Sequence, residues 1–411
     1  MKVYITGMGA VSSLGNCPQE IFQALAQNQS GVRHMPLWQK YNGLFSHLAA
    51  PAQPYDIKML PRQMRRTMSP MSEMATVATL QALAQAKLEA GEQLNSPRTL
   101  IIMGSTTGSP QTLETYFNLF AEKGGPEGQV STSFFKVMNH SVAANVASAL
   151  GFRGSVLPIA SACATSAHAL IVGWEMISKG LYDVVIAGGA DELHPVSTAI
   201  FDIVHAASRG YNDRAELTPR PFDRDRDGLV VSEGAGIVIL ESETHLKQRG
   251  ARQLAEFCGG AYLCDGSHMS QSAASTMVDT MLRTLELSNL APGKVDYVNA
   301  HATGTLQGDS EEAAAIAQVF GPQTPVSSLK AHFGHSLAAC GALEVIASVQ
   351  MMEAGVLIPT RNLQNVDPSC SGINHIKEKH SAKISSVLSN NFAFGGMNTS
   401  LLITAVAKEE N

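Results

Sequence analysis

The sequence predicts an α/β protein, in which β-strands and α-helices alternate along the chain. Short apolar runs rich in β-branched residues alternate with longer stretches of helical character. Hydrophobic residues make up 45% of the 411 residues and charged residues only 16%, which is enough apolar material for a large core. A similar order of strands and helices recurs after about residue 250, so we expect two related halves, residues 1–250 and 251–411.

In the first half, apolar runs mark the strands and Ala-rich stretches mark the helices. The run TLIIMG at residues 99–104 is apolar almost throughout, which is typical of a strand buried on both faces. The first strand is expected to end in a tight turn at Gly7-Met8-Gly9. The expected strands are residues 3–8, 99–104, 184–189 and 236–241, and the expected helices are residues 20–27, 71–88, 141–151 and 165–179.

The second half repeats this alternation from residue 253 onward. The polar stretch that precedes it, residues 209–227, contains Pro219 and Pro221 and is expected to be a long surface loop. The expected strands are residues 253–259, 295–300, 384–390 and 401–406, and the expected helices are residues 275–290, 309–320 and 337–354.

Charge, cysteine content and hydropathy exclude several classes of protein. The formal net charge is −6, so the chain lacks the global basic field of a nucleic-acid-binding protein. Its 6 cysteines include no C-x-x-C pair, which favours reduced thiols in the cytoplasm. No uninterrupted run reaches the roughly 18 apolar residues of a membrane helix, and no apolar signal segment follows Met1. We therefore expect a cytoplasmic enzyme that binds neither nucleic acid nor membrane.

The segment SACATSAH, residues 161–168, carries Cys163. Small residues flank the thiol on both sides, as a tight strand-to-helix turn requires, so Cys163 is expected at a helix N-terminus. There the helix dipole and free N–H groups favour the thiolate over a thiol whose ordinary pKa is about 8.5. The alternative is that Cys163 is a small buried hydrophobe, as free cysteines often are.

Three further segments carry groups suited to catalysis. NAHATGT at residues 299–305 places His301 after a predicted strand, and KAHFGHS at 330–336 contains His332 and His335. The alternatives are structural histidines in turns or, for His332 and His335, a pair of metal ligands three residues apart. The Gly-bearing loop NNFAFGGMN at residues 390–398 is suited to presenting backbone N–H groups.

Together these four segments resemble the elongating branch of the β-ketoacyl-acyl carrier protein synthase family. The resemblance spans nearly the whole chain and includes RPFD at residues 220–223 and RDG at 226–228. It implies a thiolase-like fold, a duplicated five-layered α-β-α-β-α sandwich with the nucleophile in residues 1–250 and two catalytic histidines in 251–411. It also implies decarboxylative Claisen condensation of a Cys-bound acyl group with malonyl-acyl carrier protein, in fatty-acid, polyketide or aryl-polyene elongation. No cofactor is implied beyond the phosphopantetheine of the carrier.

The resemblance also implies roles for individual residues. Cys163 matches the acyl-accepting nucleophile, and His301 and His335 match the pair that acts on the malonyl thioester. The other matches are Lys330 with Glu344 as organisers of the site, Phe394 in the oxyanion hole with Gly395 beside it, Thr303 and Thr305 as phosphopantetheine contacts, Asp309 as a supporting residue and Leu113 near the acyl channel.

The resemblance implies no required metal, although some members hold a monovalent cation. The corresponding residues here are Asn299, Glu344, Ser389 and Asn390.

The implied partners are an acyl carrier protein and a second subunit, which is a copy of this chain or a related synthase or chain-length-factor subunit. We expect a docking patch for an acidic carrier, with a solvated charged face as the alternative. Its expected residues are Arg62, Arg65 and Arg66, together with Arg209 and Arg214.

The chain departs from common elongating synthases, which favours a specialised pathway. Leu306-Gln307 stand where Pro is usual, Ala393 where Gly is usual, Met397 where Thr is usual and His332 where Met is usual.

Three other functions remain open at this stage. A non-catalytic chain-length factor would lack a nucleophile like Cys163. A degradative thiolase would need a second catalytic Cys in the C-terminal loop, and residues 392–398 contain none. A cysteine hydrolase would need an orienting carboxylate or amide beside one histidine.

Overall fold

The structure, a computed structural model, describes residues 1–91, 93–266, 269 and 273–406. Within these residues, eleven strands join into one mixed sheet in the order β12-β10-β9-β14-β15-β8-β1-β7-β6-β4-β5. The strands of the first half are β1 (Val3–Val11), β4 (Thr99–Gly104), β5 (Ser155–Pro158), β6 (Val184–Asp191) and β7 (Gly234–Ser242). Those of the second half are β8 (Ala255–Cys264), β9 (Tyr297–Asn299), β10 (Pro325–Ser327), β12 (Asn374–His375), β14 (Ser386–Ala393) and β15 (Met397–Thr404).

The two halves of the sheet have the same strand order and directions. In the first half, β1-β7 and β7-β6 are antiparallel, whereas β6-β4 and β4-β5 are parallel. In the second half, β8-β15 and β15-β14 are antiparallel, whereas β14-β9 and β9-β10 are parallel. A short pairing of β1 with β8 joins the halves, and β12 extends the second one. The expected duplication is therefore visible in the strand pairing, while the boundary at residue 250 stays a prediction.

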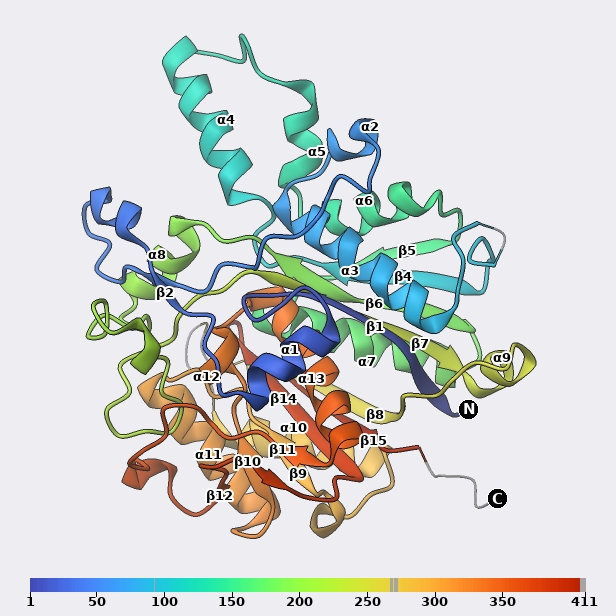
Figure 1. The fold of residues 1–411 in the computed structure, drawn as a ribbon, viewed down its shortest axis with the longest axis vertical. Coiled ribbons are helices and arrows are strands. Elements are labelled where there is room, and N and C mark those ends of the chain that lie inside the picture. Colours follow the sequence, from blue (N-terminus) through green and yellow to red (C-terminus); the bar gives the residue numbers. More distant parts are fainter. Residues whose placement is uncertain (92, 267–268, 270–272, 407–411) are drawn as a thin grey trace.

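The two halves of the sheet form two layers of the fold, and helices form the other three. In the central layer, α7 (Thr165–Ser178) packs on β6 and β8, and α13 (Cys340–Ala354) packs on β7 and β14. The outer helices α3 (Pro70–Ala86) and α6 (Ser141–Leu150) cover the first half, and α10 (Ala274–Leu287) and α11 (Leu306–Phe320) cover the second (Figure 1). The fold class is thus confirmed as a five-layered α-β-α-β-α sandwich.

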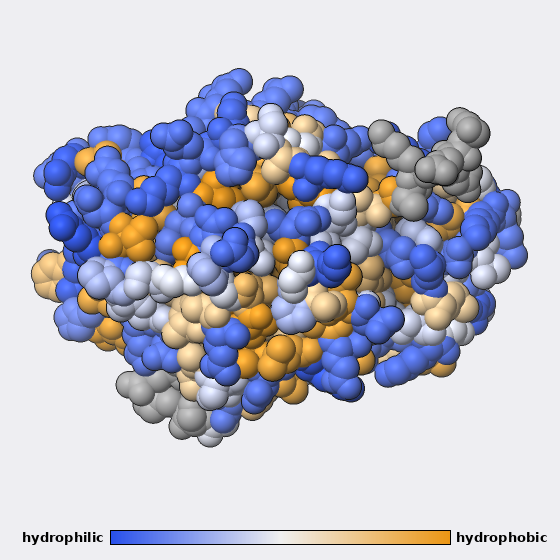
Figure 2. Space-filling view, turned by 90° about the horizontal axis from the view of Figure 1, so that it is seen from below, coloured by the Kyte–Doolittle hydropathy of each residue, from blue (hydrophilic) through white to orange (hydrophobic). Residues whose placement is uncertain are grey.

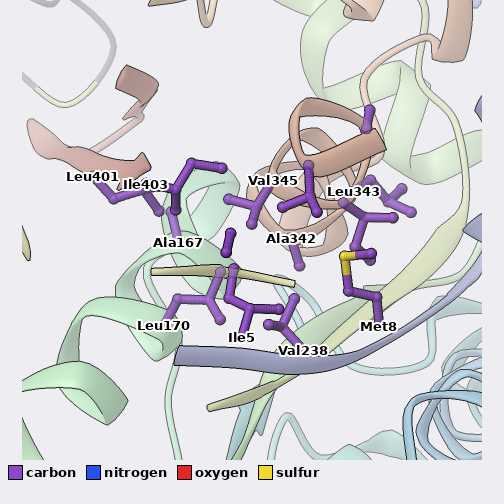
Figure 3. Packing of buried hydrophobic residues seen from close by; sticks show 14 of the residues in the cluster. Ile5, Met8, Ala167, Leu170, Val238, Ala342, Leu343, Val345, Leu401 and Ile403 are labelled. Atoms are coloured by element: carbon purple, nitrogen blue, oxygen red, sulfur yellow. The ribbon is translucent and has the colours of Figure 1, made fainter. Parts of the chain in front are cut away.

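The central layer is closely packed by small and branched side chains. Figure 3 shows Met8 of β1 pointing toward Leu343 of α13, with Ile5 of β1 and Ala167 of α7 in the same cluster. The glycines of β1 permit equally close packing on its other side, because a Cβ on Gly9 would lie 1.8 Å from the carbonyl oxygen of Ala78 in α3. The expected turn at residues 7–9 is therefore wrong: β1 continues to Val11, and its glycines admit α3.

Several elements were not expected from the sequence. An arm formed by α4 (Pro110–Lys123) and α5 (Phe134–Val137) projects from the body of the molecule (Figure 1). The short strand β10 and the helix α8 (Pro195–Ile203) were also not expected.

The remaining α-helices and short strands are α1 (Pro18–Ala26), α2 (Arg62–Arg65), α9 (Glu243–Gln248), α12 (Lys330–Phe333), β2 (Arg33–His34), β3 (Leu48–Ala49), β11 (Val356–Leu357) and β13 (His380–Ser381).

The loop at residues 209–227 lies only partly on the surface, so that expectation needs correction. Arg220, Asp223 and Arg226 are buried, and Arg220 pairs with Asp223 at 3.2 Å. The guanidinium of Arg226 donates to Asp367 at 2.7 Å and to the carbonyl oxygen of Leu306 at 2.9 Å. The polar residues of this loop predicted that it would be exposed, but ion pairs between them allow their charges to be buried inside the protein.

Replacing Arg226 with alanine is expected to destabilise the fold by about 3–5 kcal/mol, because it leaves buried acceptors without their partner. These include the carboxylate of Asp309, 3.7 Å from the guanidinium. The midpoint and slope of urea unfolding measure the change. Arg224→Ala is the matched control, because Arg224 is exposed and its surface pair contributes at most about 1 kcal/mol. Equal effects of the two substitutions would contradict this assignment.

One helical stretch of the described residues, Leu337–Ala354, is apolar and long enough to cross a membrane by composition. It includes α13, and 83% of it is buried inside the protein, so its apolar character is explained by the core. The face in Figure 2 carries many hydrophilic residues with hydrophobic patches between them.

Candidate active site

Cys163 lies in a tight turn between β5 and α7. Ala162 has a φ of +46°, which L-residues rarely adopt, and residues Ala162–Ala164 form a single 3-10 turn before the helix starts at Thr165. The Thr165 hydroxyl accepts from the N–H of Ser161 at 2.8 Å and donates to the carbonyl oxygen of Ala162 at 2.8 Å. The expected strand-to-helix turn is thus present, with Cys163 at its centre.

The second half contains an equivalent turn between β10 and α13. Leu337 has a φ of +50° and begins the 3-10 turn Leu337–Ala339, just before α13. The two turns are in contact, and the thiol of Cys340 donates to the carbonyl oxygen of Cys163 at 3.1 Å. His335 lies two residues before Leu337, so the duplicated fold brings its segment against the turn of Cys163.

Two buried carboxylates of α11 hold the loop that carries His301. Glu312 accepts from the backbone N–H groups of His301 at 2.8 Å and Ala302 at 2.6 Å. Asp309 accepts from the N–H groups of Thr303 at 3.0 Å and Gly304 at 3.1 Å. These four backbone donors are therefore held by α11, and the side chains of His301, Thr303 and Thr305 line the cavity described next.

The rings of His301 and His335 lie close together and almost perpendicular. Their centroids are 5.4 Å apart with an interplanar angle of 86°. The Nδ1 atom of each ring is buried without a hydrogen-bond partner. The segment of His335 is fixed by its own N–H, which donates to the carbonyl oxygen of Val230 at 2.7 Å.

A cavity of about 380 Å³ brings the expected catalytic residues together. Cys163, His301 and His335 all line it, although they are far apart in sequence. The rest of its lining comes from the turn after β9 with the start of α11, the end of α8 with the segment that follows, residues 227–229, α10, and the end of β14 with the loop after it. These residues are Phe201, Val204, His205, Ala206, Asp227, Gly228, Leu229, Met277, Ala302, Thr303, Thr305, Leu306, Gln307, Gly308, Glu312, Phe392 and Phe394.

Cys163 is a protonated thiol at neutral pH, contrary to the expected thiolate. Burial raises its pKa to about 12, with the nearby Asp191 carboxylate adding to the effect. The Lys330 cation and the backbone N–H groups of Cys163 and Phe394 oppose this rise but do not cancel it. The helix N-terminus does favour the thiolate, but the removal of water from a side chain that is only 5% exposed outweighs it.

This thiol predicts an unusual pH dependence of alkylation. With a pKa near 12, the thiolate fraction of Cys163 grows about tenfold per pH unit, so alkylation by iodoacetamide is expected to accelerate up to pH 10 without a plateau. Peptide mass spectrometry measures the rate, with the exposed Cys264 as an internal reference. A plateau below about pH 8.5 would show an ordinary or activated thiol and contradict the prediction.

Both histidines are neutral at pH 7. Burial lowers the pKa of His301 and of His335 well below the usual value, and the Lys330 cation lowers both further. Burial alone would lower the pKa of Lys330, but the Glu344 carboxylate paired with it raises the value overall. Lys330 is therefore a buried cation beside two neutral imidazoles, each of which carries one N–H donor.

The other expected residues divide into those at the cavity and those away from it. Thr303, Thr305 and Phe394 line it, Asp309 supports its loop, and the pair of Lys330 and Glu344 lies buried behind it. The remaining residues are not part of the lining, and their roles stay predictions. They are Leu113 in α4, Gly395 beside Phe394, and Arg62, Arg65 and Arg66 at α2.

The expected cation position has suitable oxygen atoms. The amide oxygens of Asn299 and Asn390 are buried without a donor, and the Ser389 hydroxyl accepts from Asn299 at 3.1 Å. Such neutral oxygens fit a hard monovalent cation, which these three residues would hold. Glu344 is already engaged by Lys330 and Asn391.

The paired-histidine metal site is not supported. Among the described residues, no group of three or more His, Cys, Asp or Glu could hold a metal ion. The Nε2 atom of His332 lies 3.1 Å from Asn28, and His332 does not line the cavity.

The unusual residues Ala393 and Met397 lie where the loop after β14 meets other segments. Ala393 pairs with Met397 at the end of the β14-β15 hairpin, and both pack with Cys163 in one apolar cluster. The N–H of Gly395 donates to the carbonyl oxygen of Met269 at 2.8 Å.

Two residues of the site, Glu312 and Phe201, were not predicted from the sequence. Glu312 sits three residues after Asp309 on α11, so helical spacing alone places both carboxylates under the same turn. Phe201 is in α8, and its ring centroid lies 5.5 Å from that of Phe394 and 6.4 Å from that of His335.

Comparison with known proteins places this geometry in a family. The family model "Beta-ketoacyl synthase, N-terminal domain" matches residues 1–245, and "Beta-ketoacyl synthase, C-terminal domain" matches residues 254–364. The 3-oxoacyl-[acyl-carrier-protein] synthase 1 of Escherichia coli (strain K12) is 35% identical over 98% of each chain.

Two solved structures are also similar. A Beta-ketoacyl synthase from Burkholderia phymatum STM815 is 41% identical, covers 99% of this chain and 100% of its own, and has a TM-score of 0.95. The complex titled "AntDE:AntF (apo): type II PKS acyl-carrier protein in complex with its ketosynthase bound to the hexaketide" is 28% identical, covers 99% of both chains and has a TM-score of 0.89. Fold, shared cavity and both domain matches agree that the chain belongs to the β-ketoacyl synthase family of condensing acyltransferases.

Proposed function

We propose that Cys163, His301 and His335 together catalyse decarboxylative condensation of an acyl thioester with malonyl-acyl carrier protein. The observation that carries the proposal is the single cavity that all three line, with Phe394 at its edge. The degradative thiolase reading is not favoured, because the loop at residues 392–398 supplies no second cysteine. A chain-length factor without catalysis is not favoured either, since nucleophile and both histidines are present.

In the first half-reaction, Cys163 attacks the acyl thioester. A bond forms between Sγ and the acyl carbon, the carrier thiol leaves, and the thiol proton of Cys163 passes to the departing sulfur. The neutral imidazoles are the bases available in the cavity for this transfer. The N–H groups of Cys163 and Phe394, which already point at the sulfur, suit an oxyanion developing beside it.

In the second half-reaction, malonyl thioester loses CO₂, and the electron pair of the broken C–C bond forms an enolate. One N–H from His301 and one from His335 stabilise the enolate oxygen, and the fixed loop over Glu312 keeps the first ring in place. The enolate carbon then attacks the acyl group on Cys163, which expels the Cys163 thiolate as 3-oxoacyl thioester forms. The thiolate takes up one proton from water, which restores the thiol for the next turnover. Two neutral donors suffice for this step, so the proposal assigns no cofactor beyond the carrier's phosphopantetheine.

We also propose that the chain works as a dimer in the cytoplasm. The arm of α4 and α5 exposes Phe117, Phe120, Phe134 and Phe135, and the edge strand β5 exposes Leu157. Such an apolar surface on an edge strand needs a cover, which a second copy or a related subunit would supply. Free thiols at all six cysteines suit a reducing compartment.

The proposal is tested by supplying acyl-carrier substrates that differ in chain length and unsaturation, followed by malonyl-carrier. We expect intact mass to show one acyl group on the protein, peptide mass to place it on Cys163, and 3-oxoacyl-carrier to form with release of CO₂. The preferred acyl group then distinguishes fatty-acid from polyketide or aryl-polyene elongation. Acylation of another residue, or release of free acid in place of 3-oxoacyl-carrier, would overturn the proposed function.

A further inference from the structure

The two related halves of the fold contain equivalent turns, which lie in different surroundings. We call Ala162–Ala164 the first turn and Leu337–Ala339 the second turn. Each begins with a residue of positive φ and leads directly into a helix of the central layer. Cys163 is the middle residue of the first turn and Ala338 that of the second, so the N–H of Ala338 is the counterpart of the N–H that faces the catalytic sulfur.

The strands that pack against these two turns also correspond to each other. β14 packs against the first turn and β6 against the second, and the two strands end at Ala393 and Asp191. After β14, the N–H of Phe394 faces the sulfur of Cys163. At the end of β6, the carboxylate of Asp191 accepts from the N–H of Ala338 at 2.8 Å. One half therefore presents N–H donors to the cavity, whereas in the other half a carboxylate of the protein fills the corresponding anion site.

The carboxylate of Asp191 also connects the two turns. Asp191 is only 1% exposed, and its Oδ1 accepts from the Ser105 hydroxyl at 2.6 Å and from the N–H of Thr106 at 3.0 Å. Its Oδ2 accepts from Ala338 in the second turn. The hydroxyl of Thr106 in turn donates to the carbonyl oxygen of Ala162 in the first turn, at 3.4 Å.

These contacts identify the side chain of Asp191 as an anion. Each of its oxygens accepts from a backbone N–H, which has no lone pair to take a proton in return. Burial raises the pKa of Asp191, and the hydrogen bonds that it accepts oppose this rise. Asp191 and Lys330 act on the sulfur in opposite directions, because the anion raises the pKa of Cys163 and the cation lowers it.

The second turn directly follows the segment of His335, so its anchoring bears on the position of this histidine. Before the turn, the backbone N–H of His335 donates to Val230 at 2.7 Å, and its carbonyl oxygen accepts from the N–H of Ser232 at 2.9 Å. The turn itself begins at Leu337 with a φ of +50°, a strained conformation that persists only where surrounding contacts hold it. Asp191 supplies such a contact.

We propose that Asp191 is a positioning residue for decarboxylation, whose carboxylate fills the second half's counterpart of the oxyanion hole and thereby holds His335 where the enolate oxygen forms. The inference rests on the proposed function, because it concerns the step assigned to His301 and His335. Asp191 therefore affects CO₂ release more than acyl transfer, since the imidazole of His301 remains available to take the thiol proton. The filled hole also accounts for catalysis at only one of the two equivalent turns.

The test replaces Asp191 with asparagine, which keeps the size of the side chain but removes its charge and one of its two acceptor atoms. Its NH₂ group must then face the N–H of Ala338 or that of Thr106. We expect CO₂ release from malonyl-carrier to slow about 10-fold or more, because small misplacements of a catalytic group have effects of this size. Intact mass is expected to show full loading of the acyl group on Cys163.

A second readout separates the charge of Asp191 from its structural contacts. Removal of the anion favours the thiolate, so iodoacetamide is expected to alkylate Cys163 about 3-fold faster or more at pH 8 in Asp191→Asn. Asp191→Glu keeps the carboxylate and is expected to retain slow alkylation and to recover part of the CO₂ release. Equal acceleration of alkylation in both variants would contradict a carboxylate that fills the hole.

Glu192→Gln is the matched control, because Glu192 is the next residue and carries a second buried carboxylate. Within the part of the chain that the structure describes, its hydrogen bonds go to Ser109, Gln111 and Met71 at the starts of α4 and α3, and not to the two turns. CO₂ release, acyl loading and alkylation are expected to stay at wild-type values. An equal loss of CO₂ release in Glu192→Gln and Asp191→Asn would overturn the inference.

Ser105→Ala replaces the main variant if urea unfolding shows that Asp191→Asn does not fold. It removes only the hydroxyl that donates to Asp191, and the ratio of CO₂ release to acyl transfer is expected to fall about 3-fold. An unchanged ratio in the folded variant would overturn the positioning role. Failure of the wild-type protein to load the acyl group or to release CO₂ would instead contradict the proposed function.

Discussion

Replacing Cys163 with alanine is expected to abolish condensation while malonyl thioester still loses CO₂. Loss of a nucleophile typically lowers the rate by about 10⁴–10⁶. Decarboxylation should continue, because His301 and His335 remain in the cavity and their N–H groups stabilise the enolate without help from sulfur. The measurements are 3-oxoacyl-carrier formation and CO₂ release from labelled malonyl-carrier in the same sample.

The neighbouring buried thiol Cys340 provides the matched control. It contacts the carbonyl oxygen of Cys163 but does not line the cavity. Cys340→Ala is therefore expected to keep the acyl adduct and the condensation product. If Cys163→Ala formed 3-oxoacyl-carrier at a rate near that of the wild type, the sulfur would not be the nucleophile.

The opposite result is expected for the histidines. His301→Ala and His335→Ala should each still accept the acyl group on Cys163, because the remaining imidazole can take the thiol proton, but each should lose decarboxylation of malonyl thioester. Each substitution removes one donor to the enolate oxygen, and one such donor typically contributes about 10²–10³ in rate. The acyl adduct measured by intact mass and the rate of CO₂ release separate the two half-reactions.

His332 is the control for substitution within the same segment. It is as buried as His335, but its ring bonds to Asn28 and stays outside the cavity. His332→Gln is expected to keep both half-reactions. The opposite outcome is that the His301 and His335 variants lose acylation but decarboxylate at the wild-type rate. It would contradict the assignment of the histidines to the decarboxylation step.

The sequence predicted the buried strands and the long helices, because their apolar patterns are strong. The six residues of β4 are buried along their whole length, and the predicted bounds match those observed. The three-residue strands β9 and β10 are too short to give a pattern of their own, so one was overextended and the other missed. The strand β10 forms by pairing with its neighbour β9, and the local sequence does not predict that pairing.

The two longest helices that were not predicted, α4 and α8, were missed for different reasons. In α4 only Pro110 is buried, so the helix has no core-facing stripe, although Ser109 at its N-cap and Gly124 at its C-cap were available signals. In α8 the apolar positions do have helical spacing, but they face outward. Neither helix therefore has the core-facing apolar stripe by which an amphipathic helix is predicted from sequence.

The catalytic residues were predictable from their motifs, whereas their environment was not. Cys163 and the two histidines lie in recognisable segments, but the pKa of the thiol depends on burial by residues distant in sequence. Glu312 also had to be found in the structure, because its role arises only when α11 folds beneath the turn of His301. The sequence indicated the groups, and the fold determines their protonation and support.

The most direct test of the account is a single turnover with the acyl group already on Cys163. Malonyl-carrier labelled with ¹³C in its free carboxyl group is added, and CO₂, acyl-protein and 3-oxoacyl-carrier are followed together by mass spectrometry. We expect all three to change at one rate, with CO₂ released in proportion to the acyl groups that leave Cys163. Release of CO₂ while the acyl adduct persists, with no 3-oxoacyl-carrier, would show that sulfur and imidazoles do not act on one pair of substrates in one cavity.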